Sequence, residues 1–223
     1  LSFRVNISNR KVKDAVSSLI LSHPLFAGIL IQQKFAEDNS PENPTFSVDG
    51  ETFRYNSAFA ETLSFDEIKG VCAHEACHLA GLHHTRQGAR DGEVWNRACD
   101  LAINPRLVRD GFKLPAGALI ESRFADMSAE DIYRALSAEK KQDPQGNKPA
   151  AGQPGQAPTF GQVKPAAGKS VKEVEAKTKG QIEKAISIAK IAGQLSGNDA
   201  RQIKRDMAPR YDIREVLHRF FQE

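Results

Sequence analysis

The apolar residues of this chain recur mainly at the spacing of amphipathic helices, with one short region of strand-like alternation. Residues 9–33 predict one or two helices with a break before Pro24, because the residue before a proline avoids the helical conformation. Residues 45–48 and 52–55 flank Asp49-Gly50, a dipeptide that is the strongest short-range indication of a β-hairpin. We therefore expect N-terminal helices followed by a β-hairpin.

The most clearly marked helix is expected at residues 65–81. Ser64 followed by Glu67 forms a capping box, in which each side chain bonds the backbone N–H of the other residue. Leu63 and Ile68 are placed to pack against each other across this start as a hydrophobic staple. The helix that follows the hairpin therefore has a well-defined beginning.

Two more helices are expected before residue 139. One begins near Asp91 and is bent or restarted at Asn104-Pro105, since proline lacks the N–H that a helix interior requires. The other begins at Ser128, which has Asp131 three residues later, and runs to about Leu136.

The composition changes at residues 140–169, where Pro, Gly, Ala and Gln dominate and no periodicity remains. Such a segment has too few apolar side chains to offset the entropy of ordering it, so we expect a flexible linker. After it, Ser170 and Glu173 form another capping box at the start of a long amphipathic helix. The expected organisation is a domain at 1–139, the linker, and a helical extension at 170–223 that packs on the core.

The composition is that of a globular protein and argues against a membrane-spanning or disulfide-rich one. Hydrophobic residues make up 40% of the 223 residues, enough for a buried core, but no apolar run reaches the roughly 18 residues of a membrane span. We expect no membrane contact. We expect a cytoplasmic location, because three cysteines are too few for a disulfide framework and the first residues lack the pattern of an export signal. A net charge of +3 without interleaved aromatic and basic residues does not indicate nucleic-acid binding.

Four of the six histidines lie in the eleven residues from His74 to His84. On a helix, His74 and His78 share one face and can offer two imidazole nitrogens to one zinc ion. Glu75 is rotated by about 100° from His74, so its carboxylate can serve as general base toward a metal-activated water. This HExxH pattern is typical of zinc peptidases and predicts one Zn2+ per chain.

A catalytic zinc site has three protein ligands, and the residues leave two candidates for the third. The first is His84, because the segment also fits HExxHxxGxxH, in which a glycine, here Gly81, turns the chain so that the third histidine reaches the ion. That arrangement expects a later methionine turn. Met127, however, is explained equally well as a hydrophobic staple before the helix that starts at Ser128.

The second candidate is Asp100. Asn96, Asp100 and Asn104 recur every four residues and form a polar stripe on the helix that begins near Asp91. Such a stripe is often solvated surface. If it faces the His74/His78 helix instead, Asp100 offers a carboxylate to the metal and Asn96 supports that carboxylate by a hydrogen bond.

Several blocks of this chain resemble one bacterial family. The blocks are VDG (48–50), HEACH (74–78), WNRACDLAIN (95–104), LPAGAL (114–119), MSAEDIY (127–133) and DIREVL (212–217). In order and spacing they are similar to the metallopeptidase domain that usually precedes a von Willebrand factor A-like domain. The resemblance covers about residues 12–136 and 180–221.

The resemblance implies a zincin-like metallopeptidase core in a protein often encoded beside a MoxR-type AAA+ ATPase, which is a candidate partner. The recurring Asp of the family matches Asp100 and its recurring His matches His83. The resemblance therefore favours Asp100 over His84 as the third ligand. It makes His83 and Arg86 candidates for orienting the ligands or stabilising the transition state.

The sequence therefore predicts an α+β fold that is mostly helical, with a small hairpin or sheet and a C-terminal helical extension. The first functional hypothesis is a zinc-dependent peptidase, whose peptide or protein substrate adds as an extra strand to residues 52–55. The alternative is a zinc-containing binding or scaffold module that works with the ATPase and is not itself catalytic.

Overall fold

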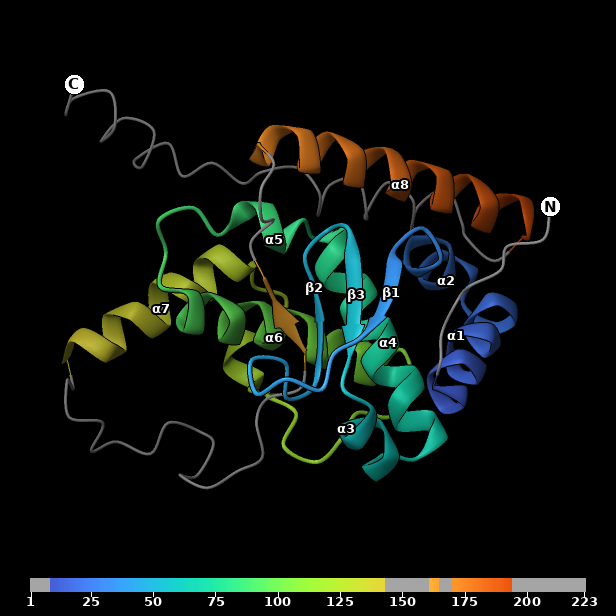
Figure 1. Ribbon diagram of the computed structural model, residues 1–223. Coiled ribbons are helices and arrows are strands. Elements are labelled where there is room, and N and C mark those ends of the chain that lie inside the picture. Colours follow the sequence, from blue (N-terminus) through green and yellow to red (C-terminus); the bar gives the residue numbers. More distant parts are fainter. Residues whose placement is uncertain (1–8, 143–160, 165–169, 194–223) are drawn as a thin grey trace.

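The computed structural model describes residues 9–142, 161–164 and 170–193 (Figure 1). Within them the chain is mostly helical with one small sheet, which confirms the expected α+β, mostly helical class. Residues 194–223 of the expected extension lie outside the described residues. The helices are α1 (Arg10–Ser22), α2 (Pro24–Leu30), α3 (Ser57–Thr62), α4 (Phe65–Ala80), α5 (His83–Arg86), α6 (Gly92–Arg109), α7 (Ala129–Gln142) and α8 (Val171–Ile191), and the strands are β1 (Lys34–Glu37), β2 (Phe46–Val48), β3 (Thr52–Tyr55) and β4 (Gln162–Val163).

The sheet has the strand order β1-β3-β2-β4. β2 and β3 form the expected antiparallel hairpin, whereas β1 pairs parallel to β3 and β4 pairs parallel to β2. At the turn, Asp49 Oδ1 accepts hydrogen bonds from the backbone N–H groups of Glu51 and Thr52, and Gly50 has a φ of 89° that favours glycine. β3 therefore lies inside the sheet, so the expectation that a substrate adds to residues 52–55 is wrong.

Part of the expected linker is regular structure. α7 continues to Gln142, beyond the expected end near Leu136, and residues 162–163 form β4 on the outer side of β2. β4 is the short gold arrow beside β2 in Figure 1. Two residues of strand in a segment rich in proline and glycine give no periodicity, so sequence patterns could not reveal β4.

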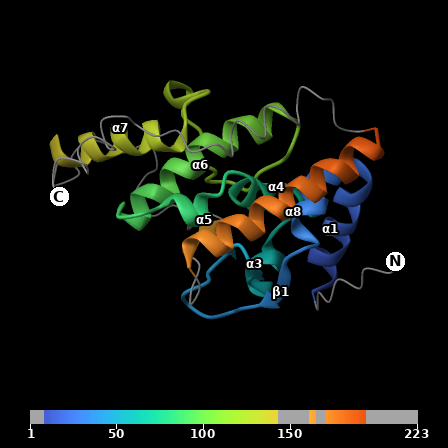
Figure 2. The same cartoon turned by 90° about the horizontal axis from the view of Figure 1, so that it is seen from above.

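The main core lies between the sheet and the helices α1, α2, α4 and α8. α4 contacts α1, α2, α6, α8 and β2, and its start carries the predicted capping box of Ser64 and Glu67. α8, whose start carries the predicted box of Ser170 and Glu173, lies lengthwise across the molecule (Figures 1 and 2) and packs on α2. There the two backbones come close, because a Cβ on Gly28 would lie 3.0 Å from Ala185 Cβ.

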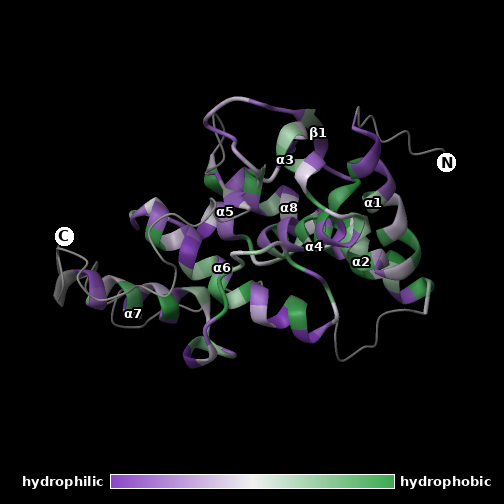
Figure 3. Ribbon diagram, turned by 90° about the horizontal axis from the view of Figure 1, so that it is seen from below, coloured by the Kyte–Doolittle hydropathy of each residue, from purple (hydrophilic) through white to green (hydrophobic). Residues whose placement is uncertain are grey.

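A second apolar cluster joins α6 to α7. It contains Leu101 of α6, Ile132 and Leu136 of α7, and Phe124 from the connection between them. Figure 3 shows apolar and polar residues alternating along α7, as expected of a helix with one packed face. Pro105 lies inside α6 without ending the helix, so of the two expectations for that residue, a bend or a restart, the restart is wrong. Among the described helices, none combines the length and the apolar character that crossing a membrane would require.

Candidate metal centre

Helices α4 and α6 bring three donor atoms together. His74 and His78 stand one turn apart on α4, and their Nε2 atoms lie 2.7 Å apart. Asp100 of α6 faces them, with its Oδ1 atom 3.4 Å from His74 Nε2 and 3.2 Å from His78 Nε2. Asp100 is 1% exposed. The polar stripe of α6 therefore faces α4 at this position and is not solvated surface.

These atoms fit a bound cation. Around a tetrahedral zinc ion, donor atoms lie about 3.3 Å apart for metal–ligand distances of 2.0–2.1 Å. The two distances that involve Asp100 are close to this value, whereas the two Nε2 atoms, at 2.7 Å, would have to move apart slightly around an ion. Asp100 Oδ1 is buried and has no hydrogen-bond partner. A buried carboxylate oxygen normally has such a partner or coordinates a metal, so Asp100 is chemically suited to be a ligand.

Glu75 lies beside these donors and is fully buried. Both of its carboxylate oxygens lack a hydrogen-bond partner. Burial, and then the charge of Asp100, raises the pKa of Glu75 well above its usual range. A metal cation beside the two carboxylates would act in the opposite direction, because it favours their charged forms.

Two hydrogen bonds orient the histidine rings. His74 Nδ1 lies 2.8 Å from Asn104 Oδ1, which can only accept a hydrogen bond. The ring proton is therefore on Nδ1, and the lone pair of Nε2 points toward His78 Nε2 and Asp100 Oδ1. His78 Nδ1 lies 3.1 Å from His83 Nδ1. Burial, and then the neighbouring His74, lowers the pKa of His78 to about 3, which keeps this imidazole neutral. Asn104 belongs to the predicted polar stripe, but the sequence did not single it out as a site residue.

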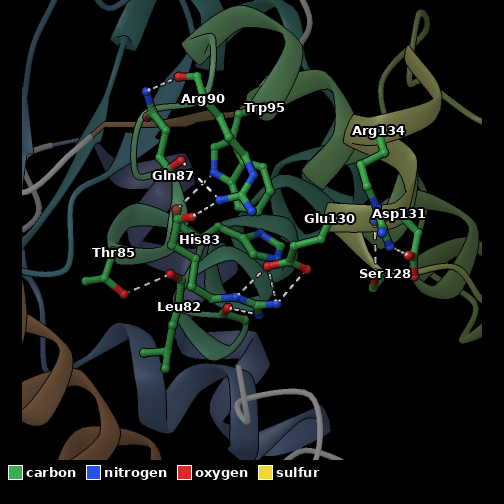
Figure 4. Close-up of polar contacts among 12 residues, drawn as sticks. Leu82, His83, Thr85, Gln87, Arg90, Trp95, Ser128, Glu130, Asp131 and Arg134 are labelled. Carbon is green, nitrogen blue, oxygen red and sulfur yellow. Dashed lines mark hydrogen bonds and ion pairs between the residues drawn. The ribbon is translucent and has the colours of Figure 1, made fainter. Parts of the chain in front are cut away.

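The turn after α4 separates His83 from His84. The turning residue is Leu82, with a φ of 54°, whereas Gly81 has an ordinary φ of −77°. Gly81 instead makes room for a ring, because a Cβ there would lie 2.5 Å from His83 Nε2. His83 therefore reaches back to His78, and its backbone carbonyl accepts a hydrogen bond from Trp95 Nε1 (Figure 4).

His84 points away from the donors. Its Nε2 atom lies 3.2 Å from Thr178 Oγ1 of α8, and its ring lies against Gly50 of the hairpin turn. The two groups of three convergent donor side chains in the described part of the chain are His74–His78–Asp100 and His78–His83–Cys99, and neither includes His84. The HExxHxxGxxH spacing is present in the sequence, but the fold does not bring its third histidine, His84, close to His74 and His78.

The second donor group shares His78 with the first. It is the less suitable of the two, because burial, and then the charge of Asp100, raises the pKa of the Cys99 thiol well above its usual range. A thiol must lose its proton to bind a metal ion. A carboxyl group also binds a metal as its anion, but it loses its proton far more readily than a thiol does.

Arg86 and Asn96 both contact parts of the chain outside α4 and α6. Arg86 donates to both carboxylate oxygens of Glu130, at 2.6 and 2.7 Å from Nη2, and to the Gly81 carbonyl. It thereby ties the end of α4 to α7. Asn96 Nδ2 donates to the backbone carbonyl of Gly161, so Asn96 contacts the segment before β4.

Residues 8–223 match the model of the family described as "Putative metallopeptidase domain". The chain belongs to this family. Membership suggests a metal-dependent peptidase, and the donor groups described above are able to hold a metal ion. Comparisons with curated proteins and with solved structures gave no match.

Proposed function

We propose that this chain is a zinc-dependent peptidase in which His74, His78 and Asp100 hold the ion and Glu75 is the general base. The observation that carries the proposal is the convergence of two imidazole nitrogens and Asp100 Oδ1 beside the unpartnered carboxylate of Glu75. Two buried carboxylates at close range are destabilising without a positive charge between them. Nitrogen and carboxylate donors suit zinc better than magnesium or calcium.

Each residue has a definite task in this proposal. A bound zinc ion supplies a Lewis acid and lowers the pKa of bound water to about 7. Glu75 takes the proton of the attacking water and returns it to the leaving amine. Asn104 and His83 keep the two ligand rings turned toward the ion. Burial of the site strengthens all of these interactions, because water does not screen them.

The second candidate function is a zinc-containing binding module. It is favoured by the burial of the donors, since His74, Glu75 and His78 are 0% exposed. A peptidase must admit its substrate to these residues, whereas a structural zinc site is closed. The two functions therefore differ in whether the fourth position of the ion is reached from solution.

Finer proposals rest on the family resemblance and on the composition. We propose a zincin-like arrangement of α4 and the sheet, an AAA+ ATPase as partner, and a cytoplasmic location. Copurification of the chain with the ATPase and fractionation of cells test the last two. Recovery of the chain outside the cytoplasm, without the ATPase, would contradict both.

Metal analysis and peptide hydrolysis on matched variants test the proposed site. The parent should carry about one zinc per chain. Asp100→Asn should lose the zinc, because only two histidines remain as ligands. His84→Ala should keep zinc, since His84 bonds Thr178. Glu75→Gln should keep zinc and fold but lose about 10²- to 10⁴-fold in hydrolysis of a peptide library.

The opposite pattern contradicts the ligand set. Zinc retained by Asp100→Asn and lost by His84→Ala would assign the third position to His84. Equal hydrolysis by the parent and by Glu75→Gln would remove Glu75 from the reaction. A parent that holds zinc and hydrolyses nothing would favour the binding module.

A further inference from the structure

The donors of the metal centre are covered by a segment that lies more than fifty residues further along the chain. Gly161 is buried and lies directly against the site. A Cβ built on Gly161 would lie 2.4 Å from His74 Nε2 and 2.9 Å from Glu75 Oε1, distances that real Cβ atoms do not reach. The backbone of Gly161 thus occupies space beside one proposed ligand and beside the proposed base.

Residues 161–164 are fixed in this position by contacts on both sides. On one side, Asn96 Nδ2 of α6 donates to the Gly161 carbonyl at 3.2 Å. On the other, Gln162 and Val163 pair with Ser47 and Val48 of β2. The Lys164 N–H then donates to the Val48 carbonyl, and Lys164 Nζ donates to the Glu42 carbonyl, both at 3.0 Å.

The described cavity nearest the site does not reach the four central residues. This cavity, between α2 and α6, is lined by Gly81 and His83, but His74, Glu75, His78 and Asp100 are not part of its wall. Gly161, which precedes the strand paired with β2, lies directly against His74 and Glu75. The complete burial of the donors is therefore partly the effect of this segment.

We propose that the edge of β2 beside the metal centre is the docking site of an extended polypeptide substrate, and that residues 161–164 occupy it as an internal inhibitory strand. This inference rests on the proposed peptidase function. A strand edge binds an extended chain through backbone hydrogen bonds, whatever its sequence. Residues 161–164 use the edge of β2 in this way, and they place a peptide group next to Glu75.

The segment has two features that suit a removable cover. First, it is short, and the net gain from each of its few hydrogen bonds is comparable to the entropic cost of fixing one residue. Second, only glycine fits as its first residue, because the φ of Gly161 is 85° and a Cβ would collide with His74. A competing substrate strand, which offers more backbone hydrogen bonds than this short segment, can therefore displace it from β2.

Hydrogen exchange and zinc extraction test the cover independently of catalysis. In the parent, the Lys164 amide should be protected from exchange, and a chelator should remove zinc slowly. Gly161→Ala should expel the segment and accelerate both processes at least tenfold. Gly117→Ala is the matched control, because Gly117 has a similar φ of 91° but open space around its Cβ position. It should behave as the parent does.

Asn96→Ala provides the second variant if Gly161→Ala does not fold. It removes the bond to the Gly161 carbonyl without adding any atom, and it should accelerate both processes in the same direction. An unprotected Lys164 amide in the parent would overturn the proposal. So would rates of exchange and of zinc loss in both variants that equal those of the parent.

Peptide hydrolysis is measured as a separate experiment. A variant that opens the segment, binds zinc and cleaves no peptide contradicts the peptidase function, whereas the exchange rates alone decide whether the segment is a cover.

Discussion

At the scale of single residues, the His74 ring is oriented by Asn104, whose oxygen accepts from Nδ1 and whose amide donates to the Leu119 carbonyl. Asn104→Ala should lower zinc affinity by about 10- to 100-fold, because the ring is then free to rotate or change tautomer. Asn104→Asp is the comparison, since it keeps the acceptor for His74, loses the donor to Leu119 and adds a carboxylate; it should retain more zinc affinity than Asn104→Ala. Zinc titration of both variants distinguishes them, and equal affinity for parent and Asn104→Ala would contradict the orienting role.

His84 gives a prediction for the dependence of stability on pH. Burial lowers the pKa of His84 to about 4, although the charges of Asp49 and Glu175 act in the opposite direction. The unfolded chain, with a His pKa near 6.5, therefore binds a proton more readily than the folded chain. The free energy of unfolding should fall as the pH drops from about 6.5 to 4, by about 3 kcal/mol from this residue.

His84→Gln should reduce this loss, because glutamine does not titrate. Denaturant unfolding of both proteins at pH 7 and pH 4, with a chelator present to remove the effect of metal, measures the difference. Parallel pH profiles for the parent and the variant would show that His84 is protonated in the folded state at pH 5.

The sequence placed some of these residues and left the positions of others open, for a physical reason. The spacing of His74 and His78 sets their common face whatever surrounds the helix. The destination of His84, by contrast, depends on one backbone angle at Leu82, which local spacing does not determine. The role of Asn104 depends on how α6 lies against α4, which is a tertiary property.

At the scale of elements, α4 runs so close to the loop before residue 115 that only glycine fits at Gly70. A Cβ there would lie 2.0 Å from the Lys113 carbonyl oxygen. Gly70→Ala should lower the free energy of unfolding by about 1–3 kcal/mol through this overpacking. Gly180→Ala in α8 is the matched control, since its Cβ position is open, and it should stabilise by up to about 1 kcal/mol. Denaturant titration that finds the two variants equally stable would contradict the close approach.

Elements with local signals were predicted well, and elements that depend on distant partners were not. Capping residues marked the starts of α4 and α8, and Asp49-Gly50 marked the hairpin. β1 and β4 have two to four residues and exist because β3 and β2 offer edges to them. The pairing of β1 and β4 with these strands cannot be predicted from any local sequence pattern.

At the scale of the whole molecule, metal binding and folding are expected to be linked. Folding buries Glu75 and Asp100 together, and a cation held by the folded chain alone stabilises it by mass action. Zinc at 100 times its Kd should add about 2.7 kcal/mol to the free energy of unfolding. Calorimetry with zinc and with a chelator measures this change in Tm. His84→Ala should keep the response and Asp100→Asn should lose it; a zinc response in Asp100→Asn would contradict the linkage.

The pairing of β2 with β4 also sets an order of events during synthesis. Asp100 completes the proposed ligand set about 60 residues before Gly161, the residue that covers it. At the usual 5–20 residues per second, the ribosome needs roughly 3 to 12 s to translate that interval. During this interval the nascent chain carries every donor of the site and none of its cover, so an ion can enter from solution before the strand closes over it.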